Sequence, residues 1–149
     1  MKTRALLVLV GLALCFALPV LAEENDKVGL ETRQQIEAVL KMREEAINKN
    51  DAAKVSALYT QEATSIRSWE SDGGLASGRQ AIEKRYAAEF ASSPGAFVDT
   101  LASVCPAGNE MCAISEGSWG LWKGYYVRIY VWDADSWKIR VEYVIFGRH

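Results

Sequence analysis

The chain has 149 residues, of which 50% are apolar and 24% charged, and its 17 basic and 19 acidic side chains give a formal net charge of −2. This composition is ordinary for a globular protein with its own core and argues against intrinsic disorder. Nucleic-acid binding requires lysine and arginine clustered on one surface, whereas basic and acidic residues are interspersed along this sequence. The sequence therefore predicts no nucleic-acid partner.

The first segment of the chain has the pattern of a secretory signal peptide. Lys2 and Arg4 precede the apolar run 5–18, and a proline and short side chains follow it. We expect residues 1–22 to be removed, which leaves one domain over residues 23–149 that is secreted or periplasmic and not bound to a membrane. The alternative is an uncleaved membrane anchor, because the apolar stretch approaches the roughly 20 residues that span a bilayer.

Helical patterns dominate the first half of the remaining chain. Apolar side chains recur at helical spacing from Leu30 to Asn48, and Asp51 is placed to cap a second, short helix through Tyr59. A strand-like run from Ala63 to Trp69 and a polar loop follow, and a third helix is predicted from Gly78 to Phe90. The expected buried stripe of the first helix consists of Ile36, Val39, Leu40, Met42, Arg43, Ala46 and Ile47.

The second half of the chain has the pattern of an antiparallel sheet. Four segments rich in β-branched and aromatic residues are separated by turn signals. They run from Ala96 to Cys105, Met111 to Trp122, Tyr125 to Asp133 and Trp137 to Phe146. In the last two segments the side chains alternate in character, so each strand should present one face to the core and one face away from it.

The aliphatic residues of the last two strands define the expected core face. We predict that Val131 pairs with Ile139 and Ile129 with Val141, because a one-residue slip would turn every core side chain outward. The core face then holds Val127, Ile129, Val131, Ile139, Val141, Tyr143 and Ile145. The opposite face carries Tyr126, Arg128, Tyr130 and Trp132 on one strand and Arg140, Glu142 and Val144 on the other. An exposed aromatic face is a liability unless it is covered, so this face suggests a subunit interface.

Cys105 and Cys112 are the two thiols of the predicted mature chain. They flank a turn-forming segment that can bring two strand ends together, and an exported protein folds in an oxidising compartment. We therefore predict a disulfide between them, worth about 2.5 kcal/mol in the chain-entropy description; the alternative is two unpaired buried thiols. Two thiols and one histidine, His149, are too few for a zinc site, so no metal is expected.

Several short segments occur in an order that resembles a known superfamily. They are Asn50-Asp51, Ala57-Leu58-Tyr59, Gln61-Glu62-Ala63-Thr64, Gly78-Arg79-Gln80-Ala81-Ile82, Gly117-Ser118-Trp119 and Trp137-Lys138-Ile139. This series resembles the SnoaL-like branch of the nuclear transport factor 2-like superfamily, which includes ketosteroid isomerases and polyketide cyclases. The resemblance implies an α+β, cone-shaped fold in which three N-terminal helices pack on a curved, mostly antiparallel sheet, in the order ααβαββββ. It also implies a pocket inside the cone and a homodimer, here through the aromatic sheet face.

The same resemblance bears on the chemistry of that pocket. In ketosteroid isomerases a carboxylate base on the first strand moves a proton, while a tyrosine and an acid stabilise the enolate. The resemblance implies that Arg67 sits where the base would be and Arg43 near the place of the tyrosine. An arginine stays protonated at physiological pH and cannot abstract a proton from carbon. The usual isomerase apparatus is therefore disfavoured in this chain.

Other residues are candidates for acid–base work or for the pocket wall. Glu116 lies between small residues of a predicted strand, where an inward-facing carboxyl would suit proton transfer, and Asp99 is a second candidate. The alternative for Glu116 is an outward-facing side chain that pairs with Arg128 or Arg140 across the sheet. Aromatic side chains with polar tips suit a ligand pocket. The expected pocket lining is Tyr59, Arg67, Trp69, Tyr86, Trp119 and Tyr143.

The sequence supports functional hypotheses from different classes. The first is an exported pocket protein that binds a small apolar or anionic molecule without a cofactor, with Arg67 as a charge partner. The second is an enzyme of the isomerase, cyclase or hydrolyase kind that uses Glu116 or Asp99, and the third is a dimeric interaction module that uses only its sheet face. We prefer the first because no complete acid–base set can be assembled from the positions that the resemblance supplies.

Overall fold

The computed structural model of the protein describes residues 29–69, 74–92 and 95–148. The chain divides into two compact units, Met1–Gln35 and Ile36–His149. In the first unit the described residues are the helical stretch 29–35, so the predicted signal peptide lies outside the described residues. No helix within the described ranges is long and apolar enough to span a membrane. The sheet and the other helices belong to the second unit.

The helices lie where the sequence predicts them. Residues 29–48 are helical, and α2 (Ala52–Ala57) and α3 (Arg79–Ser92) follow. Asp51 caps α2 as predicted, because its carboxylate accepts a hydrogen bond from the backbone N–H of Lys54 at 3.0 Å. The helix ends earlier than predicted, and Tyr59 instead begins the first strand.

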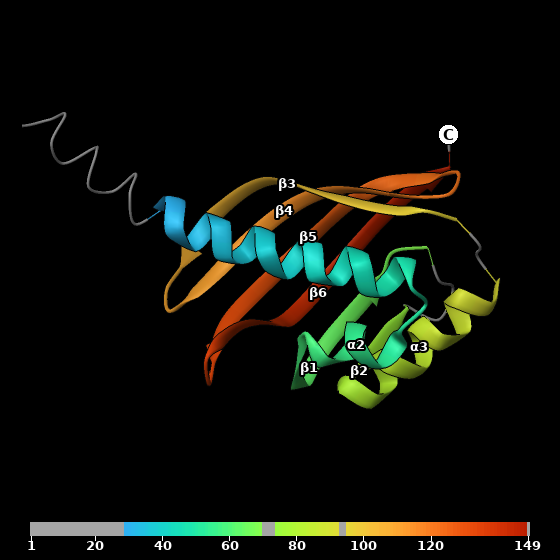
Figure 1. Cartoon of the computed structure of the whole chain (residues 1–149), viewed down its shortest axis with the longest axis horizontal. Helices are drawn as coiled ribbons and strands as arrows, with labels where there is room; N and C mark the ends of the chain where they lie inside the picture. Colours follow the sequence, from blue (N-terminus) through green and yellow to red (C-terminus); the bar gives the residue numbers. More distant parts are fainter. Residues whose placement is uncertain (1–28, 70–73, 93–94, 149) are drawn as a thin grey trace, which may run out of the picture. The chain divides into compact units, whose positions relative to one another are not determined.

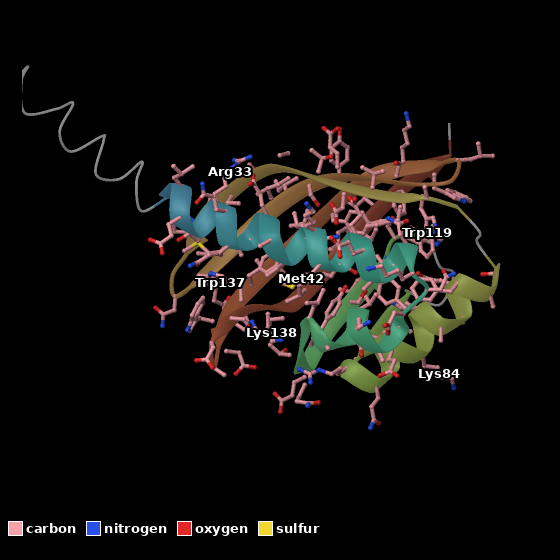
Figure 2. The ribbon with its side chains drawn as sticks, viewed as in Figure 1. Arg33, Met42, Lys84, Trp119, Trp137 and Lys138 are labelled. Atoms are coloured by element: carbon pink, nitrogen blue, oxygen red, sulfur yellow. The ribbon has the colours of Figure 1, made fainter. Side chains whose placement is uncertain are left out.

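The buried stripe of the first helix is close to the predicted one. Its members in the second unit are Ile36, Val39, Leu40, Arg43, Ala46 and Ile47, which are all buried. Met42, which the sequence places in this stripe, is instead 50% exposed (Figure 2). One helical step of about 100° separates Met42 from Arg43, and the two side chains therefore lie on different faces. Arg43 is thus buried in this stripe as predicted, although it is charged.

Six strands form one sheet in the order β2-β1-β6-β5-β4-β3 (Figure 1). They are β1 (Tyr59–Arg67), β2 (Leu75–Ser77), β3 (Phe97–Ala107), β4 (Glu110–Trp119), β5 (Trp122–Asp133) and β6 (Ser136–Arg148). β1 and β6 are parallel, and the other neighbouring pairs are antiparallel. The predicted α+β class, with three helices and a mostly antiparallel sheet, is confirmed. The short strand β2, paired with β1, is an addition to the predicted order.

The register between β5 and β6 is partly the predicted one. Ile129 pairs with Val141, as expected. Val131 pairs with Lys138 instead of Ile139, because the register shifts between the pairs Ile129–Val141 and Tyr130–Ile139, where β6 has one extra residue, Arg140. The predicted pair of Val131 with Ile139 is therefore wrong.

The assignment of faces is wrong for most of β5 and β6, although Ile139 is buried and Trp132 and Arg140 are exposed, as predicted. Five other residues expected to face outward are at most 1% exposed, namely Tyr126, Arg128, Tyr130, Glu142 and Val144. We call their side of the sheet, which packs against the helices, the inner face. The outer face carries Tyr143 and Ile145, which are 38% and 43% exposed. Buried charges can replace aliphatic side chains here because each charge meets a partner of opposite sign.

The cysteines are cross-strand neighbours. Cys105 on β3 pairs directly with Cys112 on β4, and both are free thiols in this structure. The Cys105 thiol donates to the backbone carbonyl of Cys112 at 3.6 Å. The predicted disulfide is thus not formed here, and it stays a prediction for the oxidised protein.

Candidate functional site

Charged side chains occupy the middle of the core. Arg43 comes from the first helix, Arg67 from β1, Asp99 from β3, Arg128 from β5 and Glu142 from β6, and their side chains are at most 2% exposed. We call these five residues the buried charge cluster. Charges at such depth are tolerated only when they are paired and hydrogen-bonded.

Glu142 and Asp99 each bridge two guanidinium groups. Glu142 Oε2 lies 2.8 Å from Arg128 Nε and 3.0 Å from Arg43 Nη2. Asp99 Oδ2 lies 2.8 Å from Arg128 Nη2 and 3.1 Å from Arg43 Nη1. Arg128 Nη1 also donates to the hydroxyl of Ser115 at 2.8 Å. These two carboxylates therefore neutralise the guanidiniums of Arg43 and Arg128.

Aromatic side chains enclose the cluster and add to its stability. The guanidinium carbon of Arg43 lies 4.9 Å from the ring centroid of Tyr126 and 5.1 Å from that of Phe97, within the range of cation–π attraction. Arg43 donates to the hydroxyl of Tyr86, which in turn donates to Glu142 at 3.4 Å. Burial raises the pKa of Tyr130 to about 12, so its phenol stays neutral at physiological pH.

The ionisation of Glu142 makes the fold sensitive to acid. Burial alone would raise the pKa of Glu142, but Arg43, Arg128 and Arg67 together hold it well below its ordinary value of 4.5. The folded-state pKa lies below the unfolded one, so this stabilisation is complete above the unfolded value and is lost as pH falls toward the folded value. We expect the free energy of unfolding, measured by urea denaturation, to fall between about pH 5 and about pH 2. A Glu142→Gln variant should show a weaker decline, and an identical decline would contradict this assignment.

A pocket of about 230 Å³ opens beside the buried charge cluster, and we call it the tryptophan pocket. It is lined by Arg67, Trp69, Glu89, Ser92, Trp119, Trp122 and Phe146. Trp119, labelled in Figure 2, packs on Phe90 of α3, with ring centroids 6.0 Å apart. Trp69 packs on Phe146 at 5.2 Å. Most of the wall is thus aromatic and suits a planar apolar body.

Arg67 and Glu89 form the polar end of the tryptophan pocket. Arg67 Nη2 lies 3.3 Å from the nearer oxygen of Glu89, and the guanidinium carbon lies 5.6 Å from the ring centroid of Trp69. Arg67 Nε is buried without a hydrogen-bond partner among the described residues. Burial raises the pKa of Glu89, and the attraction of Arg67 only partly opposes this shift. This end can therefore accept a polar ligand group, whereas no group of three or more potential metal ligands occurs within the described ranges.

The structure brings together three of the six residues predicted to line the pocket. Arg67, Trp69 and Trp119 lie in its wall. Tyr59 and Tyr86 are fully buried and do not line it, and their hydroxyls lie 3.4 Å apart. Tyr143 is on the outer face of the sheet and takes no part in the pocket.

The two candidate acid–base residues lie in different places. Asp99 is held between two guanidiniums in the buried charge cluster. Glu116 is exposed on the outer face, beside an open groove of about 710 Å³. Neither of the expected arginines pairs with it, because Arg128 is buried on the inner face and Arg140 lies 2.6 Å from Glu110. The groove is larger than the tryptophan pocket, but no buried charged group lines it.

Sequence reasoning missed Glu89, Glu142 and the inward position of Arg128. One signal was present, since the correct pairing of Ile129 with Val141 also places Arg128 directly opposite Glu142. Opposite charges that face each other on neighbouring strands are a stabilising pair on either side of a sheet. For Glu89 the helical spacing from Tyr86 places both residues on one face of α3.

The arrangement of helices and strands places the chain among proteins with the nuclear transport factor 2-like fold. A protein of unknown function from Mycobacterium tuberculosis matches with a TM-score of 0.70 and 18% identity, over 83% of this chain and 76% of that one. A nuclear transport factor 2-like protein of unknown function from Shewanella oneidensis matches with a TM-score of 0.66 and 18% identity, over 76% and 98%. A ketosteroid isomerase-like protein from Erwinia carotovora atroseptica matches with a TM-score of 0.65 and 16% identity, over 78% and 96%.

The protein thus has the nuclear transport factor 2-like, ketosteroid isomerase-like fold that the sequence resemblance implies. No family model matches the chain, and no curated protein matches it significantly. At these identities the similarity concerns the fold alone. The function must therefore be argued from the residues of the site.

Proposed function

We propose that the protein binds a small organic molecule in the tryptophan pocket and carries out no reaction on it. The observation that carries this proposal is the guanidinium of Arg67 in a mostly aromatic wall, because this side chain is 2% exposed and its Nε has no hydrogen-bond partner among the described residues. A buried donor without a partner costs about 1–3 kcal/mol, and a ligand acceptor would recover part of that cost. The indoles around it supply apolar contact area for the rest of the ligand.

The size of the pocket limits the ligand. Its volume of about 230 Å³ lies below the range of about 300–1,000 Å³ that is typical of pockets for drug-sized ligands. The buried charge cluster closes its inner end, because Arg67 contacts both Glu89 and Glu142. A molecule with one or two fused rings is therefore a better match than a four-ring steroid.

An acid–base enzyme has less support. Asp99 is ion-paired with both Arg43 and Arg128 in the buried charge cluster and does not line the tryptophan pocket. Glu116 lies on the outer face, away from the aromatic wall. Glu89 is the one carboxylate among the residues that line the tryptophan pocket, so it lacks there the second acid of an acid–base pair.

Filling the pocket should abolish binding. Ser92 lines the pocket and lies on the exposed side of α3, so a Ser92→Phe variant should fold and place its ring in the cavity. We expect 2-naphthoate and its neutral amide to quench the tryptophan fluorescence of the native protein, and we expect at least about tenfold weaker binding of both by the variant. Ala87→Phe, on an exposed position of the same helix, is the matched control and should bind normally. Equal binding by all three proteins would contradict the proposed site.

We also propose a homodimer, formed through the outer face of the sheet and not through the aromatic face that the sequence indicates. The outer face exposes Val98, Ile114, Tyr125, Tyr143 and Ile145, each between 38% and 51%. Apolar side chains gathered on one sheet surface are typical of an interface, and a standard one covers about 800 Å² per subunit. The face is continuous across β3, β4, β5 and β6, as their pairing requires.

A charge placed on that face should separate the subunits. We expect the native protein to sediment as a dimer at micromolar concentration and a Tyr125→Asp variant to sediment as a folded monomer, because an aspartate would be buried without a partner. Leu75→Asp is the control, since Leu75 is 62% exposed on β2 at the far edge of the sheet. A native monomer, or an unchanged dimer in the Tyr125 variant, would exclude this interface.

A further inference from the structure

The charges of the interior balance only when Glu89 is counted. The two fully buried carboxylates, Asp99 and Glu142, are matched by Arg43 and Arg128 at 2.8–3.1 Å. The charge of Arg67 lies 3.9 Å from Glu142, beyond hydrogen-bonding distance. Its closer partner is Glu89, and both residues line the tryptophan pocket.

The contact between Arg67 and Glu89 is loose. Both oxygens of Glu89 lie 3.3–3.4 Å from Arg67 Nη2, whereas charge-assisted hydrogen bonds are usually about 2.7–2.9 Å long. The Glu89 side chain is 21% exposed, and Nε of Arg67 has no hydrogen-bond partner within the described part of the chain. The guanidinium therefore has donor capacity that Glu89 does not use, and the carboxylate beside it is partly open to solvent.

Resting on the proposed ligand pocket, we infer that its ligand is a planar aromatic monocarboxylate. The ligand carboxylate replaces Glu89 as the ionic partner of Arg67, and Glu89 takes up one proton. In this exchange Glu89 passes from carboxylate to carboxylic acid, and the ligand supplies the one negative charge that Arg67 requires. The protonated Glu89 can then donate its O–H to the ligand carboxylate. A dianion would bring one charge more than this site can neutralise.

The surroundings of Glu89 favour proton uptake. The charged groups that act on it are Arg67 from β1, Arg85 from α3, Arg43 from the first helix and Glu142 from β6. Burial already raises the pKa of Glu89 despite the three arginines, and Glu142 adds to the shift. A second carboxylate at Arg67 would weaken the main attraction that keeps Glu89 ionised and would place a like charge beside it. Both effects stabilise the protonated form.

Calorimetry can count the proton directly. The native protein is titrated with 2-naphthoate and with 2-naphthamide at one pH in two buffers that differ in ionisation enthalpy. We expect naphthoate to bind with uptake of close to one proton and the amide to bind with none. Above the pKa of Glu89, naphthoate affinity should fall about tenfold per pH unit, as one-proton linkage requires, while amide affinity stays level.

A Glu89→Gln variant isolates the role of the carboxylate. It should bind naphthoate at least as tightly as the native protein at neutral pH, without proton uptake or a pH slope, and Glu116→Gln should behave like the native protein. Naphthoate binding without proton uptake by the native protein would overturn the inference even if the glutamine variant did not fold. Binding of the amide but not of naphthoate would overturn the carboxylate preference and leave the pocket standing. Binding of neither compound would overturn the proposed pocket itself.

Discussion

Replacing Glu142 with glutamine should lower the free energy of unfolding by about 3–5 kcal/mol, because it removes one of the two buried counter-ions that Arg43 and Arg128 share. Glu142 is fully buried, accepts a hydrogen bond from Arg128 at 2.8 Å and forms an ion pair with Arg43 at 3.0 Å. A glutamine keeps the size of the side chain and loses its charge, so the change isolates the ionic contribution. Urea denaturation at neutral pH measures it.

The control for this variant is the same substitution on the outer face. Glu116 is exposed, and Glu116→Gln should change the free energy of unfolding by less than about 0.5 kcal/mol. If the Glu142 variant were as stable as this control, the buried charge cluster would contribute no net stability. The interior would then have to tolerate unpaired guanidiniums, which the cost of burying a charge argues against.

Replacing Arg128 with methionine should also cost about 3–5 kcal/mol of unfolding free energy. Arg128 holds three partners at 2.8 Å, and its loss leaves Asp99 with Arg43 alone. Asp99 Oδ1 is already buried without a hydrogen-bond partner among the described residues, so this carboxylate has no second oxygen contact that could compensate for the loss of Arg128. Arg140→Met is the control, because its pair with Glu110 is half exposed on the arginine side and should be worth at most about 1 kcal/mol.

The pair can be tested further with a double-mutant cycle. Combining Arg128→Met with Asp99→Asn should cost less than the sum of the single changes, by about 0.5–3 kcal/mol, since each single change strands the other charge. Strictly additive costs would show that the two residues do not act on each other. Each substitution would then destabilise the protein through its own packing, independently of the other.

Local pattern was sufficient to predict most of the fold. The cap at Asp51, the three helices and the four long strands depend on neighbours close in sequence, and each lies near its predicted place. The pairing of Ile129 with Val141 also follows from alternation alone. The register shift between residues 129 and 130 carries no comparable local signal, and the pairing beyond it was therefore wrong.

The site was less predictable, because it depends on residues that lie far apart in the sequence. Alternation on β5 and β6 defines two faces but not which of them is inside, and an arginine normally marks the outside. Here Arg128 is buried because Asp99, 29 positions earlier, and Glu142, 14 positions later, arrive at the same point. Only the assembled sheet shows that the charges cancel. Arg67, Trp69 and Trp119 were identified for the pocket through the family resemblance and aromatic character, whereas Glu89 was not.

The position of Arg43 has a consequence for how the molecule can open. Its guanidinium lies 3.1 Å from Asp99 on β3 and 3.0 Å from Glu142 on β6, so detachment of residues 36–48 would remove one of the two guanidiniums that each carboxylate shares with Arg128. Partial unfolding of that segment is therefore penalised by the cost of leaving buried charges with too few partners. We therefore expect the helix and the sheet to unfold in one cooperative step, without a partly unfolded intermediate that proteases could cleave or that could aggregate.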